Sequence, residues 1–242
     1  NGNGNDYSNA KVNGCIDVND NSIVNVKVDS DSIANANVAA IVKPGGHFKK
    51  DEALRLFAQM QRKDVEPDQI TYVSVLKACA MQQGSVEGKY VHHHITCNGI
   101  KPNLILGNAL LDMYIKCGNM EDAYEVFDSL LNPNVVSWTS MISGYYKREK
   151  GEEALELYKQ MQMMMVKPNE VTLLNVISTC SSTGALRYGK YVHSQVIEEG
   201  LDWYEAINNS LLCMYARCGY VIDANTFFKQ MYRPSVIAWT TM

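Results

Sequence analysis

Hydrophobic residues recur every three or four positions through most of the chain, in short blocks that turn residues separate. Such spacing places the apolar side chains on one face of an α-helix. In the stretch 104–134 the first block is followed by Cys117-Gly118, which favours a helix end, and the second block ends before Pro133. The stretch therefore predicts two antiparallel helices, whose buried faces consist of Leu106, Ala109, Leu110, Met113 and Tyr114 and of Met120, Ala123, Val126, Phe127 and Leu130.

The same blocks return at a spacing of 101 residues. The segment from Gly88 reads GKYVHHHITCNG and that from Gly189 reads GKYVHSQVIEEG, and 189 − 88 is 101. The same offset relates NALLDMYIKCGNMEDA, from Asn108, to NSLLCMYARCGYVIDA, from Asn209. A period of this length indicates a repeat array, and such arrays usually build a long binding surface rather than a catalytic pocket.

Proline followed by a polar residue divides most of the array into units of 35 or 31 residues. Each unit predicts one helix pair, so we expect an all-α fold, a right-handed superhelical solenoid of antiparallel helix pairs. A small residue recurs at positions 53, 88, 123, 154, 189 and 224, where two helices must approach closely. The expected parts are a disordered or poorly structured leader at 1–47 that includes a degenerate first half-repeat, the second helix of a degenerate repeat at 48–68, full units at 69–103, 104–134, 135–169, 170–204 and 205–235, and a truncated unit at 236–242.

Composition limits the possible functions. The 242 residues are 46% hydrophobic, but no apolar stretch approaches the roughly 20 residues that span a bilayer. The formal net charge of −4 argues against indiscriminate electrostatic binding of a polyanion. Cys79, Cys117, Cys180 and Cys218 recur with the repeat and are expected to be small core residues. We expect neither a membrane nor a small-molecule substrate among the partners.

Candidate catalytic and metal-binding patterns are weak. His92, His93 and His94 are consecutive, so they point to different sides of a helix, and only His92 recurs, as His193. The H-x-E and P-C-x-x-C motifs of a zinc deaminase do not occur. The sequence predicts no catalytic residue, no metal site and no cofactor.

One unit carries a resemblance to a known family. The stretch 135–169, VVSWTSMISGYYKREKGEEALELYKQMQMMMVKPN, closely resembles a pentatricopeptide repeat. The alternation of 35- and 31-residue units resembles the plant subclass in which standard, long and short repeats are interleaved. In that interpretation 135–169 is a standard repeat, 69–103 and 170–204 are long repeats, and 104–134 and 205–235 are short repeats.

The resemblance implies sequence-specific binding of single-stranded RNA, at about one base per repeat. In the family, the fifth and last residues of standard and short repeats select the base. The base-reading residues are then Asn108 with Asn134, Thr139 with Asn169, Asn209 with Ser235, and Thr240 of the truncated unit.

In the family, the second residue of a repeat wedges between bases. In this chain, the long repeats are expected to select a base poorly. The fifth residues of the two long units, Val73 and Leu174, cannot hydrogen-bond a base edge. Their last residues are Asn103 and Tyr204. The wedging residues implied for the other units are Ile105, Val136, Ala206 and Ile237.

A basic residue at the thirteenth position of three units suggests a contact with phosphates. Lys116, Lys147 and Arg217 share this position and would form one column along the first helices. A solvated surface stripe is the alternative. With the family's pairings and a parallel RNA, units 104–134 through 236–242 would prefer 5′-Y-A-n-C-R-3′, where n faces 170–204.

Other interpretations remain open from the sequence. Asparagine and serine at these positions are also common helix caps and turn residues. A tetratricopeptide-like scaffold for protein partners would also stack helix pairs. An RNA-editing enzyme or nuclease whose catalytic domain lies outside this sequence is the third possibility. The resemblance implies a location in the mitochondrion or chloroplast and, beside RNA, editing or processing factors as partners.

Overall fold

The computed structural model describes residues 50–231 and 233–242, so the expected leader at 1–47 lies outside the described residues. The described residues form twelve helices and no strand. None of these helices is both long and apolar enough to cross a membrane. The helices are α2 (Lys50–Arg62), α3 (Gln69–Met81), α4 (Ser85–Cys97), α5 (Leu104–Cys117), α6 (Met120–Asp128), α7 (Val135–Tyr146), α8 (Gly151–Met163), α9 (Glu170–Thr183), α10 (Leu186–Glu198), α11 (Glu205–Arg217), α12 (Val221–Gln230) and α13 (Val236–Thr241).

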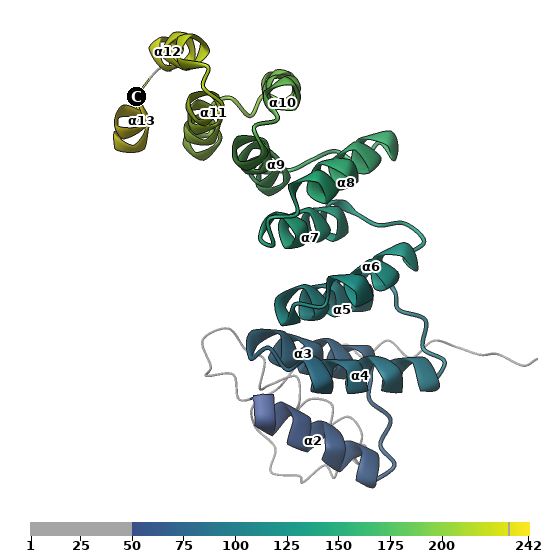
Figure 1. Ribbon diagram of the computed structural model, residues 1–242. Helices are drawn as coiled ribbons and strands as arrows, with labels where there is room; N and C mark the ends of the chain where they lie inside the picture. Colours follow the sequence, from purple (N-terminus) through teal and green to yellow (C-terminus); the bar gives the residue numbers. More distant parts are fainter. Residues whose placement is uncertain (1–49, 232) are drawn as a thin grey trace, which may run out of the picture.

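Consecutive helices form pairs that stack along one curved array (Figure 1). The pairs are α3 with α4, α5 with α6, α7 with α8, α9 with α10, and α11 with α12. The first helices α3, α5, α7, α9, α11 and α13 also pack on one another in that order. The main contacts therefore join neighbouring pairs, as in a solenoid. The predicted all-α solenoid of helix pairs is confirmed.

Polar caps determine where most of the first helices begin. The side chains of Asp68, Asn103, Asn134, Asn169 and Ser235 each accept a hydrogen bond from a backbone N–H of the following helix. A proline directly precedes each of these caps, and the residue before a proline is disfavoured in the helical conformation. The preceding helix therefore ends before each cap, and the next helix starts directly after it.

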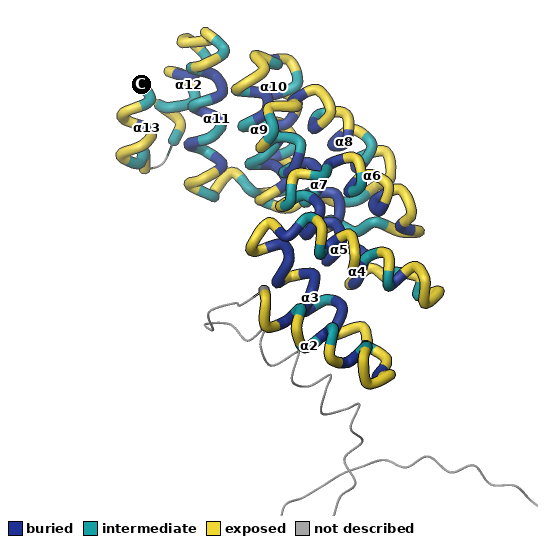
Figure 2. Tube along the Cα trace, turned by 60° about the horizontal axis from the view of Figure 1, so that its bottom comes forward, coloured by how far each residue is buried: buried dark blue, intermediate teal, exposed yellow. Residues whose placement is uncertain are grey.

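The apolar faces meet in one core that runs along the array, with exposed residues on the outside of the helices (Figure 2). Gly88 and Gly189 lie at the closest approaches. A Cβ atom on Gly88 would lie 2.2 Å from the Met113 sulfur, and one on Gly189 would lie 2.7 Å from the Met214 sulfur. The alanines at 53, 123, 154 and 224 are also buried. The expected close approach is confirmed at the two glycines, and burial of the four alanines is consistent with it.

The repeated cysteines also lie where the repeat predicts. Cys79 and Cys180 are fully buried, and Cys117 and Cys218 are partly buried. The thiol of Cys117 lies 4.0 Å from the carbonyl oxygen of Cys79, and that of Cys218 lies 3.8 Å from the carbonyl oxygen of Cys180. These side chains fill space between consecutive first helices, as expected of small core residues.

Candidate nucleic-acid interface

The first helices bring the fifth residue of one unit next to the cap that starts the following first helix. In unit 104–134 these residues are Asn108 and Asn134. The Asn108 Nδ2 atom lies 3.5 Å from Asn134 Oδ1, and the hydroxyl of Ser137 donates to Asn108 Oδ1 at 2.6 Å. Asn134 Oδ1 also accepts the backbone N–H groups of Val136 and Ser137, each at 3.1 Å. The two asparagines therefore share one hydrogen-bond network at the start of α7.

Unit 135–169 links its two residues through a third. The hydroxyls of Thr139 and Thr172 lie 2.6 Å apart, and Thr172 donates to Asn169 Oδ1 at 2.8 Å. Asn169 and Thr172 also form a capping box at the start of α9. Thr139 is buried, and it reaches Asn169 only through Thr172.

Unit 205–235 repeats the direct contact. The hydroxyl of Ser235 donates to Asn209 Oδ1 at 2.9 Å, and the backbone N–H of Ala238 donates to Ser235 Oγ at 3.2 Å. In the truncated unit, the exposed Thr240 hydroxyl donates to the carbonyl oxygen of Ile237 at 3.0 Å. The structure thus brings together Asn209 and Ser235, while Thr240 bonds only to its own helix.

Ser137 and Thr172 were not predicted as site residues. Each is the third residue of its unit, is buried, and holds the fifth residue of the unit before it. Thr71 occupies the same position in unit 69–103 and is also buried. The recurrence of a hydroxyl at the third position is visible in the sequence and is the signal that could have identified these residues.

The capping alternative is correct for the last residues of these units. Asn134, Asn169 and Ser235 all cap the next first helix. Capping occupies the oxygens of the two asparagines, but their Nδ2 groups take no part in it. The cap therefore fixes the orientation of the side chain and leaves the amide donors outside the capping bonds.

The two long units lack a polar pair of this kind. In unit 69–103, Val73 is partly buried, and Asn103 instead exchanges two hydrogen bonds with Gln69, at 2.8 and 2.9 Å. In unit 170–204, Leu174 is partly buried and the ring of Tyr204 stacks on Trp203. Neither fifth residue offers a hydrogen-bonding group.

A column of exposed aliphatic side chains runs beside these pairs. The second residue of every first helix from α3 to α13 is exposed, and five of the six are bulky, with exposures from 49% to 64%. Single exposed apolar residues are common, but a column repeated in consecutive helices indicates a contact surface. Two of its members, Ile70 and Val171, were not predicted because they belong to long units. The column consists of Ile70, Ile105, Val136, Val171, Ala206 and Ile237.

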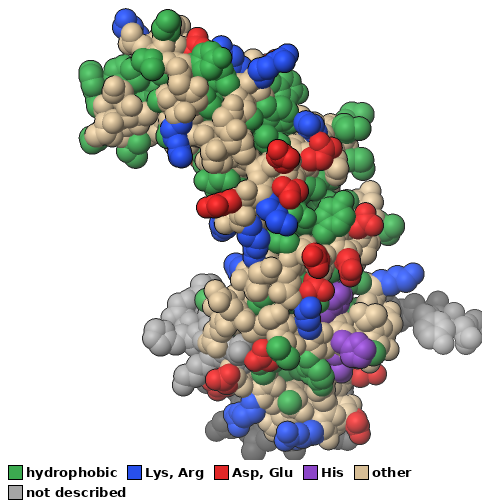
Figure 3. Space-filling view, viewed as in Figure 1, with side chains coloured by type: hydrophobic (Ala, Val, Ile, Leu, Met, Phe, Trp, Pro, Cys, Tyr) green, Lys and Arg blue, Asp and Glu red, His purple; other side chains and the backbone are tan. Residues whose placement is uncertain are grey.

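The three basic residues lie at the far ends of the first helices. Lys116 forms an ion pair with Asp112, one helical turn earlier, at 2.8 Å. Lys147 and Arg217 are exposed at the ends of α7 and α11. Basic and acidic side chains are interspersed along the array in the view of Figure 3. The face seen in Figure 3 therefore offers separate positive charges rather than a basic patch.

The three consecutive histidines have separate partners. His92 bonds to the hydroxyl of Tyr114 at 2.8 Å and His94 to that of Tyr72 at 3.0 Å, while His93 lies 3.3 Å from the thiol of Cys97. Among the described residues no three metal-ligating side chains gather in one group. Burial lowers the pKa of His92, although Asp122 and Glu125 oppose the shift. His92 therefore has a structural contact, which His193 repeats with Tyr215 at 2.9 Å.

Comparison with known proteins identifies the repeats. The model of the PPR repeat family matches residues 133–182, the model of the pentatricopeptide repeat domain matches 55–116, and the PPR repeat model matches 108–133 and 209–233. In fold, the chain is similar to the pentatricopeptide repeat protein PPR10 from maize, with a TM-score of 0.64, 23% identity, and coverage of 77% of this chain and 27% of that chain. It is also similar to PPR10 in complex with an 18-nt psaJ RNA element, with a TM-score of 0.58, 23% identity, and coverage of 82% and 32%.

Relatives from Arabidopsis thaliana point to the same family. Pentatricopeptide repeat-containing protein At4g15720 is 38% identical over 80% of this chain and 32% of its own length. The chloroplastic relative At2g02980 is 36% identical over 79% of this chain and 32% of its length, and the mitochondrial relative At1g06140 is 37% identical over 81% and 35%. The expected chloroplast or mitochondrial location is thus that of close relatives. The chain spans about a third of the length of these relatives. The repeat-model matches and these relatives together show that the chain belongs to the pentatricopeptide repeat family.

Proposed function

We propose that this chain binds single-stranded RNA along its first helices, with one base facing each reading unit. The observation that carries the proposal is the column of exposed aliphatic side chains on consecutive first helices, which runs beside the polar pairs of units 104–134, 135–169 and 205–235. Polar pairs suit base edges, and aliphatic side chains suit the faces of bases between them. The similarity in fold to PPR10, whose structure is known in complex with an 18-nt RNA element, supports RNA as the ligand.

The hydrogen bonds of unit 135–169 define what the site offers to a base. Thr172 uses its only hydroxyl proton on Asn169, so Thr139 must be the donor in the bond between the two threonines. Thr139 then presents lone pairs, and the Asn169 Nδ2 group presents two hydrogens. An acceptor beside a donor is complementary to the N6 donor and ring-nitrogen acceptor of adenine, the base expected here.

The substitution Asn169→Asp reverses one half of this pattern. Aspartate retains the oxygen that caps α9 and accepts from Thr172, but it replaces the amide donor with a second acceptor. Two acceptors are complementary to the adjacent N1–H and N2–H2 donors of guanine. We expect the preferred base at this position to change from adenine to guanine, while the flanking bases of 5′-Y-A-n-C-R-3′ stay the same.

Selection from a random single-stranded RNA pool tests the proposal, with the unchanged chain and the Asn169→Asp variant in parallel. Discrimination of one base by hydrogen bonds is worth roughly 1–3 kcal/mol, so the enrichment should be measurable at one position. Asn225→Asp, on the exposed outer helix α12, adds the same charge away from the first helices and serves as the control. Unchanged preference in the Asn169→Asp pool, or a change at every position, would exclude base reading by Thr139 and Asn169.

We further infer that the units follow the standard, long and short pattern, with the boundaries set by their closing prolines, and that the phosphate contacts come from Lys116, Lys147 and Arg217. The chain would then specify a site for organellar RNA processing or C-to-U editing, which other factors carry out. An organelle extract depleted of this protein tests that role: editing of the bound RNA should be lost in the depleted extract and should return when the protein is added back. Binding to a peptide array instead of RNA would favour the protein-scaffold alternative.

A further inference from the structure

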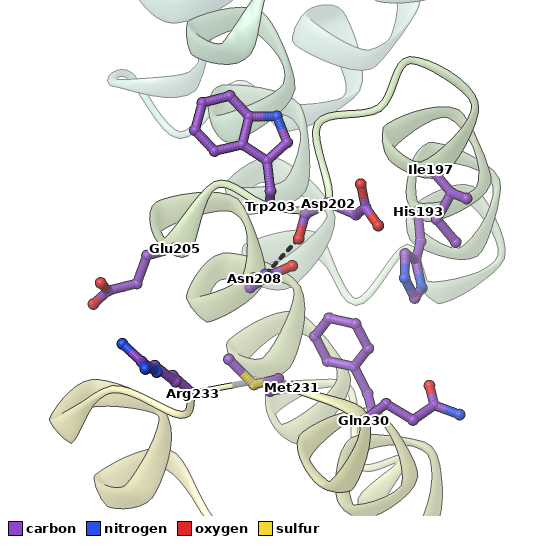
Figure 4. Close-up of a pocket in the computed structure, with 10 residues that line it drawn as sticks. His193, Ile197, Asp202, Trp203, Glu205, Asn208, Gln230, Met231 and Arg233 are labelled. Carbon is purple, nitrogen blue, oxygen red and sulfur yellow. Dashed lines mark hydrogen bonds between the residues drawn. The ribbon is translucent and has the colours of Figure 1, made fainter.

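The junction before α11 differs from every other start of a first helix that the structure describes. Trp203 exposes 71% of its surface, and its ring stacks on Tyr204 with centroids 3.9 Å apart and planes at 30°. The indole stands out from the backbone on the side away from Asn208 (Figure 4). One face of the aromatic pair is therefore open to a flat ligand.

The loop that carries the aromatic pair is held in place. The Asn208 Nδ2 group donates to the carbonyl oxygen of Asp202 at 2.7 Å, and the backbone N–H of Tyr204 donates to that of Leu201 at 3.2 Å. The backbone N–H of Asn208 donates to the carbonyl oxygen of Tyr204 at 3.1 Å. These bonds fix the aromatic pair before any ligand arrives, which lowers the entropy that binding would cost.

Three features that other units use are missing at this junction. The fifth residue of unit 170–204 is Leu174, which has no hydrogen-bonding group. Tyr204 replaces the polar cap found at the other first helices from α3 to α13, and it makes no side-chain cap bond. The exposed aliphatic column is reduced here to the methyl group of Ala206. An exposed indole therefore lies where both the polar pair and the bulky aliphatic residue are lacking.

The surroundings of Trp203 carry no net positive charge. Trp203 borders a hollow of about 590 Å³ whose wall includes the apolar side chains of Phe227 and Met231. Two carboxylates, of Asp202 and Glu205, and the guanidinium of Arg233 also line it, with Arg233 near Glu205 (Figure 4). One arginine beside two carboxylates leaves no net positive charge to attract a phosphate. The open aromatic face therefore suits a base better than the phosphate backbone of a nucleic acid.

We propose that Trp203, backed by Tyr204, is a stacking platform for the nucleobase that faces unit 170–204, so that this unit holds its base without selecting it. The inference rests on the proposed function, because it presumes that RNA lies along the first helices. Stacking on an aromatic side chain tolerates any base, since each has a π-face. The platform predicts that position n of the target contributes affinity but little discrimination.

The test uses the full chain and a fluorescein-labelled RNA that carries 5′-CAACA-3′ between uridine flanks, with binding measured by anisotropy. Trp203→Ala should weaken binding by about 5- to 150-fold, the range expected for loss of one stacked base. Trp203→Phe should retain most of the affinity. Tyr220→Ala removes an exposed aromatic at the start of α12 and should bind like the unchanged chain. Circular dichroism checks that the variants are equally helical.

An RNA with an abasic nucleotide at the third position of the pentamer completes the cycle. On that RNA the unchanged chain and Trp203→Ala should bind alike, because the stacking partner is gone. Equal binding of both proteins to the intact RNA, or a loss in Trp203→Ala that persists on the abasic RNA, overturns the platform. If the unchanged chain binds no single-stranded RNA, the proposed function fails as well, so the two failures are distinct.

Discussion

The basic residues at the ends of the first helices should weaken RNA binding by unequal amounts when they are replaced. Lys147 and Arg217 are exposed and stand outside the ion pairs found among the described residues. Lys116 is held by Asp112 at 2.8 Å, and both side chains are about half exposed. A phosphate must therefore compete with Asp112 for Lys116, whereas the other two side chains are available.

The expected magnitudes follow from counterion release. Each phosphate contact of a single strand contributes about 0.7 to the slope of log affinity against log salt. Lys147→Ala and Arg217→Ala should each lower that slope by about 0.7, which is ~4-fold in affinity at ~0.15 M salt. An exposed ion pair one helical turn apart is worth about 0.3–0.5 kcal/mol, so giving it up offsets roughly half of the gain from Lys116. We expect Lys116→Ala to weaken binding only ~2-fold.

Anisotropy titrations over a series of KCl concentrations measure these slopes. Asp112→Ala is the matched control, because it frees Lys116 and should strengthen binding ~2-fold. The losses should be the same for every RNA sequence, since phosphates carry no base identity. Equal losses for all three lysine and arginine variants would refute the argument from the ion pair. A loss confined to one sequence would refute the phosphate contact itself.

Two further predictions concern stability. A Cβ on Gly88 would collide with the buried Met113, so Gly88→Ala should destabilise the fold by about 1 kcal/mol, an overpacking cost of ~1–3 kcal/mol less a gain of ~1 kcal/mol in helix propensity. In a chain that also carries Met113→Ala, the clash is removed, and Gly88→Ala should instead raise Tm by about 2–4 °C. A fall in Tm for that double variant, measured by thermal denaturation, would contradict the steric explanation. Burial lowers the pKa of His92 and His193 below the value of 6.5 that they have in the unfolded chain. Below pH 6.5 the unfolded chain therefore binds more protons than the folded chain. The contribution of these histidines to stability should be full above pH 6.5 and should decline on acidification. In a plot of Tm against pH, the double variant His92→Gln/His193→Gln should show a smaller fall of Tm on acidification than the unchanged chain. If the two plots have the same shape, other groups cause the acid sensitivity.

The fold was predictable because its determinants are local. Each helix pair is specified by its own apolar stripes, and every full unit except 170–204 closes with a proline and a polar cap. The contacts between pairs repeat the same small residues. The pairing of Asn209 with Ser235 was predictable from the same register. The recurring hydroxyl at the third position could have marked Thr172 as a candidate, but its partner Thr139 was not predictable, because the contact joins side chains of consecutive units. Trp203 could not be found from the repeat pattern, because it is not the second, fifth or last residue of its unit. Its stacking on Tyr204 also has no counterpart in the other units.

In the proposed function, capping and base reading use the same side chain, and this would restrict how the interface can change. Asn169 holds the start of α9 with its oxygen and would meet a base with its nitrogen. Replacing a capping side chain by alanine costs about 1 kcal/mol of stability, so residues that keep an oxygen accepting from the backbone avoid this cost, whereas Tyr204 at the last position of unit 170–204 makes no such bond. Asparagine, aspartate, serine and threonine satisfy that condition and differ in the donors and acceptors left over. If the last residue of a unit reads a base as proposed, it can change that base and keep the cap of the next helix only within this short list of residues.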